Sequence, residues 1–197
     1  MTSCMRQERI GFALCGSFCT HEAVLKALKT LTEIYQTIIP IVSEISAASD
    51  TRFGTAESLL EQVRALTGRD ALRTIPDVEP IGPKKLLDAL IIAPATGNTI
   101  AKLAHGVTDS AVTMAAKAHL RNDRPVIIAV SSNDGLSAGA KNIGELLARK
   151  NYYFVPFGQD NAAAKPTSLV ADFSRLPETV DAALRGRQIQ PLLLCGE

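Results

Sequence analysis

Residues 89–99 read Ala-Leu-Ile-Ile-Ala-Pro-Ala-Thr-Gly-Asn-Thr, so that an apolar run passes directly into small hydroxyl and amide side chains. The segment 86–93 is nearly all apolar, which is typical of a strand covered on both faces in a parallel sheet. Pro94 lacks a backbone donor and is expected to end this strand. The stretch therefore predicts an α/β protein in which a buried parallel strand leads into a polar loop.

The loop after this strand has two interpretations. Thr96, Asn98 and Thr99 can hydrogen-bond a phosphate or the edge of a planar ring, and Gly97 lets a ligand approach the backbone closely. Asn98 and Thr99 are also good N-cap residues for a helix that begins near residue 100. The residues by themselves favour neither the ligand loop nor the plain helix cap.

Apolar runs alternate with segments of helical periodicity along the rest of the chain, as expected of βαβ units. The predicted strands cover 10–14, 37–42, 86–93, 125–130 and, as the last strand, 152–155. One helix is predicted to begin after Thr20, and the others cover 56–66, 100–103, 112–120, 142–150 and 176–185. The segments 52–54 and 75–83 are expected to be irregular. We expect residues 1–197 to form a single domain with a Rossmann-like, doubly wound and mainly parallel sheet flanked by helices.

The composition argues against several classes of protein. The net charge is +1 and no cluster of Lys and Arg interleaved with aromatic residues occurs, so nucleic acid is not an expected partner. No apolar run approaches the ~20 residues of a membrane span, and residues 1–14 lack the apolar region of a signal peptide. We therefore expect a cytoplasmic protein without a membrane partner. The cysteines form no paired CxxC motif, so free thiols and no metal site are expected for Cys4, Cys15, Cys19 and Cys195.

Small polar residues follow four of the predicted strands, at Gly16-Ser17, Ser43, 96–99 and 131–133. Because the carboxyl ends of parallel strands share one edge of a sheet, these residues are expected to line one crevice. Gly16 and Ser17 precede a helix N-terminus, where free backbone donors favour a phosphate. Neither GxGxxG nor GxxxxGK[ST] occurs, so FMN fits this crevice better than NAD or ATP.

The segment 94–110, Pro-Ala-Thr-Gly-Asn-Thr-Ile-Ala-Lys-Leu-Ala-His-Gly-Val-Thr-Asp-Ser, resembles the central signature of the flavoprotein superfamily of homo-oligomeric flavin-containing cysteine decarboxylases. The order of the motifs at 11–20, 51–54, 114–122 and 153–160 agrees with that family as well. This resemblance implies a three-layer α/β/α fold and a homo-oligomer. Within the superfamily, the chain is similar to a branch that supplies the second subunit of a two-subunit synthase active in the mother cell of sporulating bacteria.

That branch implies a reaction and a partner. The synthase oxidises a small dihydropyridine dicarboxylate to an aromatic pyridine dicarboxylate, with NADP as the usual acceptor. The first subunit is the one that resembles a dinucleotide-binding dehydrogenase, so NADP is expected on the partner and FMN on this chain. Carried over by position, Gly16 and Ser17 would meet the flavin phosphate, Ser43 the ribityl chain or ring, and Thr96, Asn98 and Thr99 the phosphate and the ring edge. The full set expected to contact the cofactor also includes Pro94, Ala95, Ser131 and Ser132.

Departures from the superfamily pattern argue against decarboxylation of a cysteine. The decarboxylating members use a histidine between the second and third strands, and no histidine lies between His21 and His105. Their later Pro-x-Met-Asn segment is replaced here by Ser-Ser-Asn-Asp-Gly-Leu-Ser-Ala-Gly at 131–139.

The candidates for catalysis are few. His21 lies in the first turn of a helix and could face the crevice as a proton carrier, and Arg52 is the preferred partner for a substrate carboxylate. Lys165 lies in a predicted loop that could fold over the crevice. His119 is expected to be an ordinary helix residue, and His105 is expected to interact with the carbonyls at a helix end.

Three functions fit these residues. The chain could complete a two-subunit oxidoreductase and bind FMN or substrate. It could instead be a non-catalytic partner that stabilises the first subunit, or an independent FMN-dependent decarboxylase or reductase of another small acid.

Overall fold

A computed structural model describes residues 5–194, and its centre is a seven-stranded sheet with the order β2-β1-β3-β4-β7-β6, in which β5 also pairs with β4. Strands β1 to β5 are parallel to one another, whereas β7 pairs antiparallel with both β4 and β6. The strands are β1 (Arg6–Leu14), β2 (Tyr35–Val42), β3 (Ala89–Ala95), β4 (Val126–Ser132), β5 (Tyr152–Phe154), β6 (Phe157–Asn161) and β7 (Lys165–Ala171). The predicted doubly wound, mainly parallel α/β fold is confirmed.

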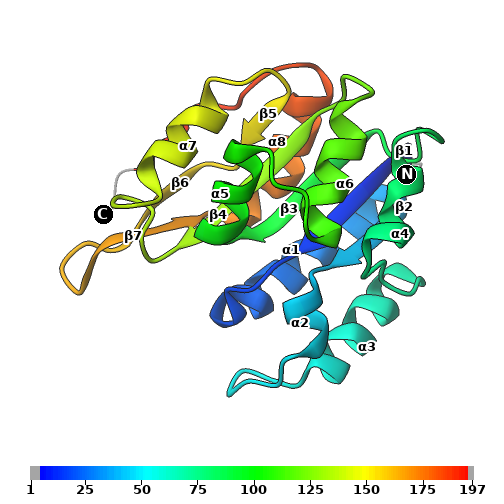
Figure 1. The fold of residues 1–197 in the computed structure, drawn as a ribbon, viewed down its shortest axis with the longest axis horizontal. Coiled ribbons are helices and arrows are strands. Elements are labelled where there is room, and N and C mark those ends of the chain that lie inside the picture. Colours follow the sequence, from blue (N-terminus) through cyan, green and yellow to red (C-terminus); the bar gives the residue numbers. More distant parts are fainter. Residues whose placement is uncertain (1–4, 195–197) are drawn as a thin grey trace.

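Helices cover both faces of the sheet (Figure 1). One face carries α5, α6 and α7, and the other carries α1 and α8, with α2 and α3 grouped at the β2 side. The helices are α1 (His21–Ile34), α2 (Glu44–Ala48), α3 (Ala56–Thr67), α4 (Ile75–Val78), α5 (Gly97–His105), α6 (Ala111–Leu120), α7 (Ala140–Leu147) and α8 (Leu176–Leu184). Part of the chain between α4 and β3 forms a further short 3-10 helix, Glu79–Ile81.

The core follows from the apolar runs of the central strands. Every residue of β3 is buried, and only the last residue of β4 is partly exposed. Strands with both faces covered by helices bury nearly all their side chains, which is why their sequences show no polar alternation. The polar residues that follow these strands lie where the sheet ends, so the fold brings them to one edge.

The structure corrects several predicted boundaries. Strand β3 continues through Pro94 to Ala95, although its register with β4 shifts between Ile92 and Ala95. The segment 75–83 is not irregular throughout, because Thr74 caps a short helix through a capping box with Asp77. In α1 the fully buried face is Val24, Ala27, Leu28 and Leu31, and Leu25 is only half-buried.

The largest correction concerns the chain after β5, which is not the last strand. Strands β6 and β7 form an antiparallel hairpin that projects beyond the parallel part of the sheet (Figure 1). Lys165 is therefore the first residue of β7 and not part of the predicted loop.

Membrane spans and metal clusters are both missing from the described residues. Between residues 5 and 194, no helix is both long and apolar enough to cross a membrane. The same residues include no group of three or more His, Cys, Asp or Glu side chains that could hold a metal ion. Cys4 and Cys195 lie outside the described residues, whereas Cys15 is a buried free thiol and Cys19 an exposed one.

Candidate functional site

A cavity of about 910 Å³ lies at the carboxyl ends of β1, β3 and β4, where the β6–β7 hairpin forms one wall. Its volume is within the range of about 300–1,000 Å³ that is usual for small-molecule sites. The lining is polar over much of its surface, with contributions from Ser17, Cys19, Thr20, Thr96, Gly97, Asn98, Ser131, Ser132, Asn133, Asp134, Asp160, Lys165, Ser168, Leu169 and Val170. The edge of the sheet that the sequence predicted as a ligand crevice is thus hollow.

Ser17 has a backbone conformation that is unusual for a residue with a side chain. Its φ of 68° and ψ of 50° place it in the left-handed region, which costs an L-residue roughly 1–2 kcal/mol. The conformation directs the Ser17 hydroxyl to Ser131, with 2.6 Å between the two Oγ atoms. The Ser17 carbonyl accepts from the Thr20 hydroxyl at 2.8 Å. Strain of this kind is often found at binding sites, where surrounding contacts maintain it.

Two substitutions at Ser17 separate strain from the hydroxyl contact. Both Ser17→Gly and Ser17→Ala remove the bond to Ser131, but glycine adopts a positive φ freely. We expect the glycine variant to be more stable than the alanine variant by about 1 kcal/mol. Urea denaturation of both variants measures this difference, and equal stabilities would show that the loop relaxes without strain.

The turn between β3 and α5 settles which residue caps the helix. The Thr96 hydroxyl accepts from the backbone N–H of Thr99 at 3.2 Å, and the two threonine hydroxyls are 3.1 Å apart. Asn98 and Thr99, the predicted N-cap residues, are both inside the helix, because α5 begins at Gly97 rather than near residue 100. The cap is therefore provided by Thr96, and the exposed Asn98 side chain faces the cavity without a role in capping.

Gly97 permits a close contact between two loops. A β-carbon at this position would lie 2.6 Å from Asp134 Oδ1 and 2.8 Å from Ser132 Oγ. Any larger residue would push both side chains away from the N-terminus of α5. The loop after β4 is thus packed against the first residue of α5, and it brings Asp134 into the cavity.

The polar turns line two neighbouring cavities rather than the single predicted crevice. A second cavity of about 350 Å³ includes Gly16, Ser43 and Thr99, and it shares Thr96 and Asn98 with the larger one. The Ser43 hydroxyl is already engaged, since it bonds Ser46 at the start of α2. Pro94 and Ala95 line neither cavity because they are buried inside β3.

The buried Cys15 lies beside the smaller cavity. Burial raises the pKa of its thiol to about 12, and a hydrogen bond with Thr99 only partly opposes this rise. At neutral pH the thiol is therefore protonated and packs as a small apolar side chain.

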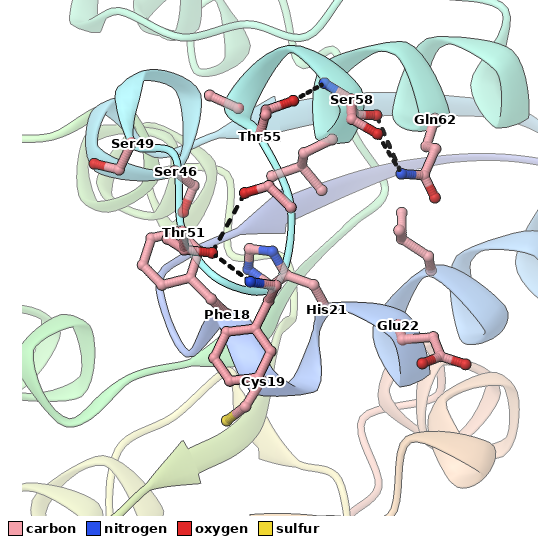
Figure 2. Close-up of a pocket in the computed structure, with 15 residues that line it drawn as sticks. Phe18, Cys19, His21, Glu22, Ser46, Ser49, Thr51, Thr55, Ser58 and Gln62 are labelled. Atoms are coloured by element: carbon pink, nitrogen blue, oxygen red, sulfur yellow. Dashed lines mark hydrogen bonds between the residues drawn. The ribbon is translucent and has the colours of Figure 1, made fainter.

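His21 borders a third, smaller pocket of about 250 Å³ between α1, α2 and α3, where Figure 2 shows it among Phe18, Cys19 and Thr51. Its Nε2 lies 2.8 Å from the carbonyl oxygen of Cys15, which can only accept, so Nε2 carries a proton. Burial lowers the pKa of His21, while hydrogen bonds to the backbone raise it less. The imidazole is therefore neutral near pH 7 and faces a pocket other than the large cavity.

The other two candidates for catalysis lie in different places. The Arg52 guanidinium stacks over the Phe53 ring, with Cζ 4.8 Å from the ring centre, and Arg52 lines none of the three cavities described above. Lys165 lines the large cavity but pairs with Asp160 at 2.6 Å. The Asp160 carboxylate raises the pKa of Lys165. The structure therefore does not bring His21, Arg52 and Lys165 together.

Sequence reasoning missed the acidic residues of the large cavity, Asp134 and Asp160. In the sequence, Asp134 stands in the polar segment after β4, and Asp160 is the last residue of the motif at 153–160. A signal was present for Asp134, because the segment 131–139 that contains it stands in place of the Pro-x-Met-Asn segment of the superfamily pattern.

The five parallel strands lie in the order β2-β1-β3-β4-β5, and the large cavity lies over the ends of β1 and β3. This arrangement is typical of mononucleotide-binding flavodoxin-like sheets. The family model described as Flavoprotein matches residues 1–173, and the chain belongs to this family. The family expected from the residues is thereby confirmed.

Individual proteins extend the comparison. The chain is 43% identical over 192 residues to the B subunit of dipicolinate synthase from Bacillus subtilis (strain 168), a match that covers 98% of this chain and 96% of that protein. The crystal structure of the dipicolinate synthase B subunit from Bacillus halodurans C is 44% identical, has a TM-score of 0.88, and covers 96% of this chain and 97% of that one. The FMN-dependent cysteine decarboxylase SpaF shares the fold at 24% identity, with a TM-score of 0.65 over 90% of this chain and 97% of that one.

Proposed function

We propose that this chain is the flavin-binding second subunit of a dipicolinate synthase. With the first subunit, it would oxidise 2,3-dihydrodipicolinate to dipicolinate in the mother cell of a sporulating bacterium, with NADP held by the first subunit. The observation that carries the proposal is the cavity of about 910 Å³ at the carboxyl ends of β1, β3 and β4, in a chain 43% identical to the B subunit of dipicolinate synthase. The cytoplasmic setting and a homo-oligomeric assembly are part of the same proposal.

The residues present fit a flavin mononucleotide. The Ser17, Thr96 and Asn98 side chains line the large cavity and supply neutral donors and acceptors, and Gly97 lines it beside them. Gly16 and Ser17 precede α1, so they would hold the phosphate near a helix N-terminus. Ser131 and Ser132 would meet the cofactor from the β4 side, and Ser43 and Thr99 from the neighbouring cavity. A bound flavin would supply a two-electron acceptor next to the substrate.

The first test is a visible absorption spectrum of the purified chain before and after addition of FMN, paired with dipicolinate formation by the first subunit with and without this chain. A flavin band together with activity only in the mixture supports the proposal. Activity of the chain alone on another acid would support an independent reductase or decarboxylase. Full dependence on the chain without flavin binding would make it a stabilising partner.

Asn98→Ala tests the cofactor residues directly. Removing an amide that faces the cavity should weaken FMN binding about 10-fold, because a hydrogen bond to a ligand in such a site is worth about 1–1.5 kcal/mol. Quenching of FMN fluorescence on titration measures the affinity. The matched control is Gln7→Ala, which removes an exposed amide at the opposite end of β1 and should leave the affinity unchanged. Equal affinities for wild type and Asn98→Ala would place the flavin elsewhere.

A further inference from the structure

The large cavity contains two carboxylates that differ in their partners. Asp160 is neutralised by the Lys165 ammonium at 2.6 Å. Asp134 forms no ion pair with any residue between 5 and 194. Of the two carboxylates, Asp160 is therefore balanced by a cation, whereas Asp134 has no neighbouring cation within the described residues.

The position of the Asp134 carboxylate is set by several contacts. Its backbone carbonyl accepts from the N–H groups of Ser137 and Gly139 at 2.9 and 3.0 Å, which closes a tight turn after β4. The Ser132 hydroxyl donates to Oδ1, and Gly97 provides the space that this oxygen needs. Within the described residues Oδ2 has no hydrogen-bond partner, so one oxygen orients the group and the other is available as an acceptor.

We propose that Asp134 accepts the proton that the substrate releases on oxidation. This inference rests on the proposed function, since it assigns a role to a residue in the same cavity. When a dihydropyridine dicarboxylate becomes aromatic, one ring carbon loses hydrogen with its bonding electrons, as a hydride, to a flavin or nicotinamide. The neighbouring ring carbon loses a proton to Asp134 Oδ2, and the electron pair of that C–H bond becomes the new ring double bond.

The chemistry requires such a group because the oxidant accepts a hydride and leaves one proton to be removed. A positioned base typically accelerates a proton transfer by about 10²–10⁴-fold. His21 faces a different pocket, Arg52 lines none of the cavities described above, and Lys165 is protonated at neutral pH by its pairing with Asp160. Among these candidates, Asp134 alone combines a place in the large cavity with a free basic oxygen.

The test uses the complex of this chain with the first subunit. Asp134→Asn keeps the side-chain shape and can still accept from Ser132, but it cannot take a proton. We expect kcat to fall about 10²–10⁴-fold while KM changes less than about threefold. Asp70→Asn is the matched control, and it should keep kcat within about threefold because Asp70 is exposed and lines none of the three cavities.

A second variant tests proton transfer in another way. Asp134→Ala should be as slow as Asp134→Asn, and added formate should restore part of its kcat, since a small carboxylate can enter the space left by the side chain. A purely structural role would not respond to formate. Wild-type kcat in Asp134→Asn, or failure of formate to restore Asp134→Ala, would overturn the assignment of Asp134. If the wild-type chain does not increase the rate of the first subunit, the proposed function and this inference both fail.

Discussion

Wild type is expected to lose stability when the pH falls from about 7.5 to about 5, and replacing His119 by glutamine is expected to abolish most of that loss. His119 lies on α6 and is completely buried. Its Nε2 lies 3.1 Å from the Pro125 carbonyl oxygen, so Nε2 donates, while Nδ1 is buried and has no hydrogen-bond partner among residues 5–194. A proton on Nδ1 would place an unpaired charge in the core.

The sign of the effect follows from the pKa in the two states. Burial lowers the pKa of His119 from 6.5 to about 4 in the folded protein, and the hydrogen bond to Pro125 opposes this only in part. The unfolded chain therefore binds a proton at a higher pH than the folded protein does. The stabilisation is fully present above pH 6.5 and is lost as the pH falls toward 4. The full loss amounts to about 3 kcal/mol, of which about 2 kcal/mol appears by pH 5.

Urea denaturation at the two pH values measures this effect. Glutamine can still donate to the Pro125 carbonyl but does not titrate in this range, so His119→Gln should lose about 2 kcal/mol less than wild type on acidification. His105→Gln is the control, because His105 is exposed at the end of α5. The prediction is wrong if His119→Gln and wild type lose equal stability.

Truncating Leu28 to alanine is expected to destabilise the protein by about 2–5 kcal/mol. Leu28 is completely buried where α1 packs against the sheet. Removal of its terminal carbons loses the transfer free energy of the side chain and leaves a cavity, because a packed core relaxes only in part.

Leu25→Ala is the matched control on the same helix. Leu25 is half-buried and borders the pocket of about 250 Å³, so the space left by its truncation is open to solvent. We expect it to cost well under half as much as Leu28→Ala. Midpoints of thermal unfolding and urea titrations for both variants test the comparison. Similar losses at the two positions would mean that α1 packs differently from the arrangement described here.

Much of the fold could be predicted from the sequence because its main patterns are local. The apolar runs of β1, β3 and β4 predicted buried parallel strands, since a strand covered on both faces needs apolar side chains at every position. The β6–β7 hairpin was missed for the converse reason. Gln159, Asp160 and Asn161 are exposed and polar, so this segment has the composition of a loop. The pairing of β7 with β4 depends on tertiary structure.

The candidate site shows the same division. The polar character of the turns after β1, β3 and β4 was evident, and these turns do meet at one edge of the sheet. Which side chain does what depends on backbone geometry: Thr96 rather than Asn98 or Thr99 caps α5. His119 has the sequence context of an ordinary helix residue, and only packing buries it and leaves its Nδ1 without a partner in the described part of the chain.

The sequence by itself determined the alternation of strands and helices, the family, and the edge of the sheet where the polar turns meet. Backbone periodicity and turn composition are local properties, and they do not require knowledge of distant contacts. The tertiary structure decided that the polar turns line two cavities, that His21 and Arg52 lie away from the larger one, and that Asp134 enters it against Gly97. These features depend on contacts between residues far apart in the chain, which only the folded backbone brings together.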